Sequence, residues 1–177
     1  MQKCVKYKFC SRELWLMYNG AAMFDLYDLY PNLEELFNSV MQNTRESTDK
    51  LLDVFLILAE NGEAARKYIG YDVDKLPDKA ELYALSAADD IGRMRVAVAD
   101  AISAGLGREV THEDEEIDLG LQELEAKKKT HIKLHEYIRA AGVVGLDYRS
   151  AMLAAPGMVF DMIDAANPRR QDSGDDF

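Results

Sequence analysis

The sequence predicts a mainly α-helical protein, with a helical bundle-like domain, a short N-terminal β-strand and a small C-terminal helical appendage. Three observations support this class. Apolar residues recur at helical spacing in two long stretches, 48–60 and 86–106. Cap and stop residues bracket both stretches. The alternation of polar and apolar residues that is typical of a strand is confined to residues 3–9, which carry Val, Tyr and Phe.

Thr48–Glu60 is the stretch around which the rest must pack. Its apolar side chains cover most of a helical wheel and leave only a narrow polar strip. Burying each of them contributes about 1.5–3 kcal/mol. That gain offsets the entropy cost of ordering the helix only when other elements cover it. We expect a central helix that is capped by Ser47 or Thr48 and ends at Asn61-Gly62. Its apolar residues are Leu51, Leu52, Val54, Phe55, Leu58 and Ala59.

The residues before the central helix predict one strand and three short helical units. Residues 3–9 form a strand without an obvious partner edge, so it pairs with another subunit or lies against the helices. Ser11 is the expected N-cap of the helix that follows. Asn19-Gly20 is either the C-cap of that helix or a tolerated break before the second helical unit at residues 21–30. Asn32 and Glu35 have the spacing of a capping box that opens a third.

A second long helix follows the central one. A short helix ending at Gly70 precedes a loop, and Pro77 stops that loop from being helical. Helical signals resume at Asp78 and again at Ser86. Arg95 falls inside the apolar arc of the second long helix. We favour a side chain whose aliphatic part is buried and whose charged group reaches the edge of this arc over a buried functional charge. The apolar stripe comprises Ile91, Met94, Val98, Ile102 and Leu106.

Composition changes abruptly after this helix. Residues 109–125 hold eight acidic side chains and no Lys or Arg, and three lysines follow at 127–129. The apolar residues between them recur at helical spacing, which indicates a charged helix with one narrow seam. We therefore divide the chain into a helical core domain with the N-terminal strand (1–108), an acidic helical linker (109–130), a C-terminal helical segment (131–167) and a disordered tail (168–177).

The C-terminal segment is the expected partner-binding region. Gly142 ends its first helix, and Asp147 and Pro156 begin two short ones. Methionine is concentrated here, and flexible thioethers suit surfaces that adapt to a partner. Ordinary core filling is the competing explanation, because these helices also need an inner face. The candidate partner-binding residues are Met152, Met158, Val159, Met162 and Ile163.

Net charge and cysteine content limit the classes of function. The formal charge of −11 argues against a nucleic-acid partner, because phosphate binding needs clustered Lys and Arg. Cys4 and Cys10 are too far apart along an extended strand to form a bridge, so we expect reduced thiols and a cytoplasmic location. We also expect no signal peptide and no membrane span, since no apolar run is long enough.

No motif in the chain predicts catalysis or a cofactor. His131 and His135 stand four apart on a helix, a spacing that can hold a metal, but the zincin order is absent and no Cys cluster is near. The acidic run at 113–118 lacks the alternating ligands and central Gly of a calcium loop. Neither a nucleophile elbow nor a phosphate-binding loop is found. We therefore expect no metal, no cofactor and no enzymatic activity.

Three stretches together resemble the tail assembly chaperones of long-tailed phages and prophages, which are encoded next to the tape-measure gene. The first is the opening strand with KFCSRELWLMYNGAAMFDLYDLYP. The second is TDKLLDVFLILAENGEAARKYIG with the later helix that ends in AISAGLG. The third is LHEYIRAAGVVGLDYRSAMLAAPGMVFDMIDAAN, in which Pro156-Gly157 begins the last helix.

The resemblance implies a non-enzymatic role in the bacterial host cytoplasm. Copies of the protein would coat the tape-measure protein while tail tube subunits are recruited, and self-association is possible in such assemblies. Families of this kind often make a short and a long product by frameshifting, and Lys127–Lys129 lie where such a join would fall. The alternatives are a structural or adaptor subunit of a phage particle and a cytosolic helical protein-interaction module.

Overall fold

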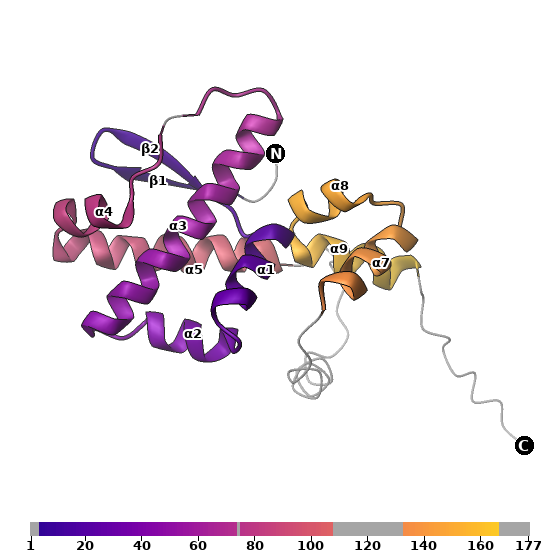
Figure 1. Ribbon diagram of the computed structural model, residues 1–177, viewed down its shortest axis with the longest axis horizontal. Helices are drawn as coiled ribbons and strands as arrows, with labels where there is room; N and C mark the ends of the chain where they lie inside the picture. The colour runs from indigo at the N-terminus through magenta and orange to yellow at the C-terminus, as the bar shows by residue number, and fades with distance from the viewer. Residues whose placement is uncertain (1–3, 74, 108–132, 167–177) are drawn as a thin grey trace, which may run out of the picture.

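A computed structural model describes residues 4–73, 75–107 and 133–166, and Figure 1 shows their arrangement. The protein is mainly helical with a short N-terminal sheet, which confirms the predicted class. The acidic linker 109–130, His131 and the tail 168–177 of the sequence prediction lie outside the described residues. The elements are β1 (Val5–Phe9), β2 (Arg12–Leu16), α1 (Gly20–Leu29), α2 (Leu33–Val40), α3 (Arg45–Tyr68), α4 (Lys79–Leu85), α5 (Ala88–Leu106), α7 (Leu134–Val143), α8 (Tyr148–Leu153) and α9 (Pro156–Ala166).

The N-terminal strand is half of a hairpin, so the prediction of a lone strand followed by a helix from Ser11 was wrong. β1 pairs antiparallel with β2, from Val5 opposite Leu16 to Phe9 opposite Arg12. Leu14 and Leu16 are buried, whereas Glu13 is exposed and Trp15 is half-buried, so the apolar period of β2 is two. Cys10 adopts φ 52°, the left-handed conformation that a tight hairpin turn requires.

The central helix α3 is longer than predicted at both ends. Thr44, rather than Ser47 or Thr48, is its N-cap, and the Thr44 hydroxyl accepts the backbone N–H of Ser47 at 3.0 Å. Asn61-Gly62 does not end it. An ideal Cβ on Gly62 would lie 1.8 Å from the Trp15 carbonyl oxygen, so this glycine allows β2 to approach the helix rather than stopping the helix. The short helix that was predicted separately before Gly70 is the last part of α3, which ends at Tyr68, before Gly70 with φ 92°.

The core lies between α3, α5 and the hairpin, and α3 crosses over α5 in Figure 1. The Tyr7 and Phe55 rings meet edge to face with centroids 5.1 Å apart. Met94 and Val98 are fully buried and Ile102 is 8% exposed, so most of the predicted α5 stripe faces this core. Leu106 at its end is 47% exposed.

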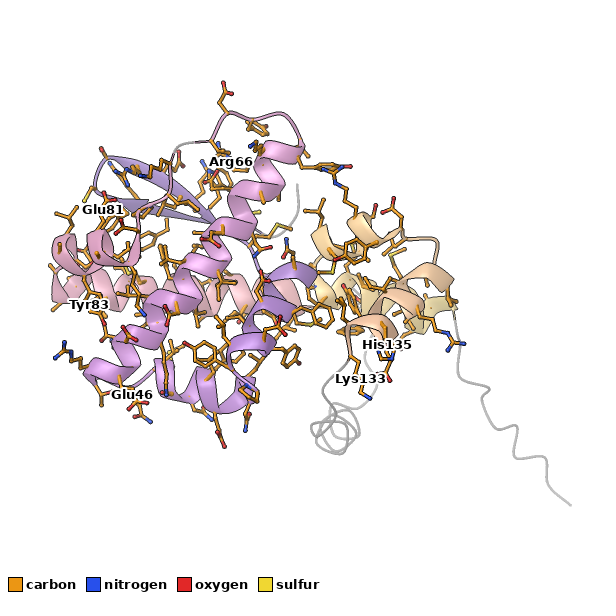
Figure 2. The ribbon with its side chains drawn as sticks, in the orientation of Figure 1. Glu46, Arg66, Glu81, Tyr83, Lys133 and His135 are labelled. Atoms are coloured by element: carbon orange, nitrogen blue, oxygen red, sulfur yellow. The ribbon has the colours of Figure 1, made fainter. Side chains whose placement is uncertain are left out.

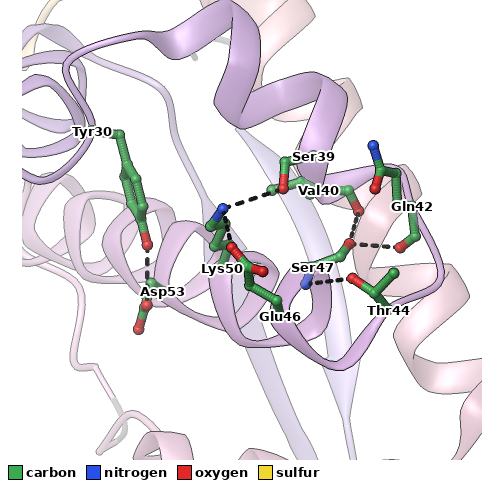
Figure 3. A network of polar contacts seen from close by, with 9 residues as sticks. All are labelled: Tyr30, Ser39, Val40, Gln42, Thr44, Glu46, Ser47, Lys50 and Asp53. Carbon is green, nitrogen blue, oxygen red and sulfur yellow. Dashed lines mark hydrogen bonds and ion pairs between the residues drawn. The ribbon is translucent and has the colours of Figure 1, made fainter.

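Arg95 of α5 binds the end of α2. Its guanidinium donates to the carbonyl oxygens of Val40 at 3.0 Å and Gln42 at 2.9 Å, and to Asn43 Oδ1 at 2.8 Å. The Ser47 hydroxyl donates to the same two carbonyl oxygens, at 3.1 Å and 2.6 Å (Figure 3). The charge is therefore at the edge, as predicted, and it satisfies carbonyl groups that a helix end leaves unpaired.

A chain of polar contacts links α1, α3 and α4. The Tyr30 hydroxyl donates to Asp53 at 3.1 Å (Figure 3), and Lys79 pairs with both Asp53 at 2.6 Å and Asp49 at 2.9 Å. Tyr83 donates to Asp49 at 3.0 Å. These groups hold α1 and α4 against the polar strip of the central helix.

Candidate functional site

The C-terminal helices α7, α8 and α9 pack directly against α1 and α5. The Gly20 N–H donates to the Ala154 carbonyl oxygen at 2.9 Å. A Cβ on Gly20 would lie 2.8 Å from the Ala151 carbonyl oxygen, and one on Gly157 would lie 2.7 Å from that of Leu106. The backbone of α8 therefore touches that of α1, and the backbone of α9 touches that of α5. We call this contact region the junction. One buried cluster includes side chains of the core and of these helices, which lie side by side in Figure 1.

Tyr137 of α7 is the main anchor of this junction. It is 1% exposed, and its hydroxyl donates to the Ala151 carbonyl oxygen at 3.1 Å. Its ring meets Phe24 of α1 edge to face at 5.4 Å and Phe160 of α9 at 6.1 Å. One side chain therefore holds α7, α8 and α9 together and attaches them to α1. The predictions from sequence did not single it out, because a lone Tyr in a helix carries no sign of its partners.

Alkaline pH is expected to destabilise the fold through two tyrosines. Burial raises the pKa of Tyr137 to about 12, and burial with the nearby Asp53 charge raises that of Tyr30 to about 12. Unfolded tyrosine titrates near pH 10, so the unfolded state loses its protons first. The stabilisation is complete below pH 10 and falls as pH rises toward 12. Urea unfolding at several pH values between 9 and 12 measures how the free energy of unfolding changes with pH.

The Tyr137→Phe and Tyr30→Phe variants serve as controls for this pH effect. Each removes one ionisable hydroxyl and keeps the ring, so the loss of stability above pH 10 should be shallower in each than in the wild type. Equal slopes in all three proteins would contradict this assignment.

The five predicted partner-binding residues differ in their burial. Val159 is 0% exposed and belongs to the core, so a partner cannot reach it. Met158 and Ile163 are half-buried and pack against the core cluster. Met152 of α8 and Met162 of α9 are also half-buried and keep part of their surface outside. Core filling therefore accounts for Val159 fully and for Met158 and Ile163 in part.

The C-terminal end of α3 exposes a second group of apolar side chains, which sequence reasoning missed. Tyr68 and Ile69 are each 55% exposed and Tyr71 is 51% exposed. Arg149 of α8 lies over the Tyr68 ring at 4.3 Å, which connects this group to the C-terminal helices. Tyr and Arg are the residue types that contribute most at protein interfaces. The available signal was two tyrosines and an isoleucine beside the helix-ending Gly70.

Two cationic side chains lie over one aromatic ring on the hairpin side of the C-terminal end of α3. Lys6 Nζ is 4.5 Å and the Arg66 guanidinium 5.1 Å from the Trp15 ring centre. Arg66, labelled in Figure 2, also pairs at 2.9 Å with Glu63, which is 6% exposed. Burial, and then the Glu63 charge, raises the pKa of the nearby Cys4 thiol, which makes this thiol a weaker nucleophile.

The described residues contain no cluster of three or more potential metal ligands. His135 lies at the start of α7 (labelled in Figure 2). Its side chain is 76% exposed, and its Nε2 is 3.9 Å from Glu136 Oε1. Its predicted companion His131 lies outside the described residues. An open depression of about 550 Å³ is lined by Arg45, Glu46, Asp49 and Tyr83. Among the helices that the structure describes, none has the length and apolar character to cross a bilayer.

Comparisons of this chain with models of protein families, with curated proteins and with solved structures found no match.

Proposed function

We propose that this protein is a non-enzymatic tail assembly chaperone of a phage or prophage, which binds the tape-measure protein and tail tube subunits in the bacterial cytoplasm. The observation that carries the proposal is the resemblance of three stretches, from the opening strand to the helix that begins at Pro156, to that family. This role requires apolar surface that holds a client polypeptide and then releases it. It requires no bond chemistry.

Two groups of partly exposed apolar side chains support such a role. Met152 and Met162 are half-buried, and an unbranched thioether fits irregular partner surfaces at little cost. Tyr68 and Ile69 leave more than half of their surface exposed, and Arg149 links Tyr68 to α8. A client that covers both groups would gain hydrophobic contact without disturbing the core.

Replacing Met152 and Met162 together by serine is expected to reduce co-purification of the co-expressed tape-measure protein at least about fivefold. Removing two interface side chains of this kind costs on the order of 1–2 kcal/mol of binding free energy. Val159 is left unchanged, because serine there would damage the core. Quantitative pull-down from cells that express both proteins gives the measurement.

Met41→Ser is the matched control for this variant. Met41 is 50% exposed after the end of α2, far along the chain from the C-terminal helices. The Met41→Ser variant should leave the recovery of the tape-measure protein and the helix content unchanged. Equal recovery with the double variant and the wild type would remove these methionines from the client-binding surface.

Mass spectrometry of purified tails separates a chaperone from a structural or adaptor subunit. A chaperone leaves before the tail is complete, so its peptides should be absent from finished particles and present in assembling extracts. Recovery of the protein from finished tails in a fixed ratio to the tube subunit would reject the chaperone proposal in favour of the structural one. The gene immediately downstream offers an independent check, since a tape-measure gene is expected there.

A further inference from the structure

The outer face of α5 is the side opposite its buried stripe. Met94, Val98 and Ile102 point into the core, whereas Val96 is 61% exposed. An ideal Cβ on Gly92 would meet nothing within 4 Å beyond its own helix. The residues of this outer face recur every three or four positions, so they form one stripe along the helix. They are Asp89, Gly92, Arg93, Val96, Asp100 and Ser103.

We propose that a second copy of this chain packs on the outer face of α5, with the two α5 helices antiparallel about a twofold axis at Val96. In such a pair, a residue a given number of positions before Val96 stands opposite the residue the same number after it in the other copy. Val96 then meets its own equivalent across the axis. Gly92, without a side chain, leaves room for the two helices to approach.

The charges on this face complement themselves in that arrangement. Arg93 is three residues before Val96 and Asp100 is four after it, so the two differ in level by about 1.5 Å across the interface. They are seven residues apart, two helical turns, and therefore share one edge of the stripe. A twofold axis perpendicular to the helices brings like edges together. Arg93 of each copy thus faces Asp100 of the other, which gives two ion pairs.

Existing contacts of Arg93 are compatible with this pairing. Arg93 Nε lies 3.6 Å from Asp89, and another of its N–H groups hydrogen-bonds Asp90. A guanidinium carries five N–H donors, so it can hold these two carboxylates and still donate to a third. Asp100 has no ion-pair partner within the parts of the chain that the structure describes. Asp89 and Ser103 are each seven residues from Val96, so the Ser103 hydroxyl can donate to Asp89 of the other copy.

The test is the monomer–dimer equilibrium of the full chain, measured by sedimentation equilibrium. The wild type should dimerise at micromolar concentrations. Asp100→Arg places two cations opposite each other at both ends of the interface and should weaken dimerisation about tenfold or more. The double variant with Arg93→Glu and Asp100→Arg restores the pairs in reverse and should recover most of the dimer.

Asp28→Arg is the matched control, since it changes net charge equally at an exposed position on α1. It should leave the equilibrium unchanged, and circular dichroism confirms that every variant is folded. A wild type that stays monomeric, equal effects of the Asp28 and Asp100 changes, or a double variant as weak as Asp100→Arg would each overturn the proposal. The measurement needs no client, so its outcome is independent of the chaperone proposal.

Discussion

Gly62→Ala is expected to be among the most destabilising single substitutions in this protein, although alanine is the better helix former. Its Cβ would lie 1.8 Å from the Trp15 carbonyl oxygen and 2.6 Å from the Trp15 carbonyl carbon. Both atoms are backbone, so no side chain can rotate away, and β2 must separate from α3. Overpacking typically costs about 1–3 kcal/mol, and a rigid backbone contact of this kind should cost more than about 3 kcal/mol. Urea unfolding at pH 7 measures the loss.

The same substitution at Gly92 provides the control. Gly92 is also inside a long helix, but nothing outside that helix lies within 4 Å of its ideal Cβ. In the monomer the intrinsic preference for alanine acts alone, so at protein concentrations too low for a second copy to pack on α5, Gly92→Ala should stabilise the protein by about 0.5–1 kcal/mol. The two variants therefore should shift stability in opposite directions. Similar shifts for both would show that the hairpin does not depend on the missing side chain at Gly62.

Tyr137→Ala is the second substitution with a large expected effect, a loss of about 3–5 kcal/mol. The ring fills the space between Phe24 and Phe160, and its removal leaves a cavity at the place where α7, α8, α9 and α1 meet. The Ala151 carbonyl oxygen also loses its hydroxyl donor. Chemical denaturation measures the global change, and hydrogen exchange should rise most in the C-terminal helices.

Tyr137→Phe divides this loss between packing and hydrogen bonding. It keeps the ring and removes only the hydroxyl, so the loss should be about 1–2 kcal/mol. Phe24→Leu is a further check, because it tests the other side of the same ring contact. If alanine and phenylalanine at position 137 were equally destabilising, the ring would contribute nothing and the junction would depend on the hydroxyl alone.

The candidate site was predicted only in part, because burial was not visible in the sequence. The apolar face of α9 is evident from helical spacing, yet Val159 is buried while Met162 on the same helix keeps part of its surface outside. The difference depends on how α9 meets α5. The exposed group around Tyr68 was missed for the same reason, since its exposure follows from where α3 extends past its neighbours.

Several features of the fold were determined by the sequence itself. Helical periodicity identified α3 and α5 as the long central helices. Asn32 and Asp147 were predicted as caps, and this is confirmed because the side chain of each accepts a backbone N–H three residues on. Gly70 ends α3 because a left-handed residue is needed there. These are local interactions, which act within a few residues and so can be predicted from them.

Only the tertiary structure decided the hairpin, the full length of α3 and the placement of the C-terminal helices. Asn61-Gly62 is a local stop signal, but α3 continues because its helical backbone there packs against β2 and the Asn61 side chain donates to Ile57 and Asp25. Likewise, Ser11 is a local cap signal that gives way to pairing between β1 and β2. Contacts between residues distant in the chain contribute more free energy than a cap, so they prevail where the two disagree.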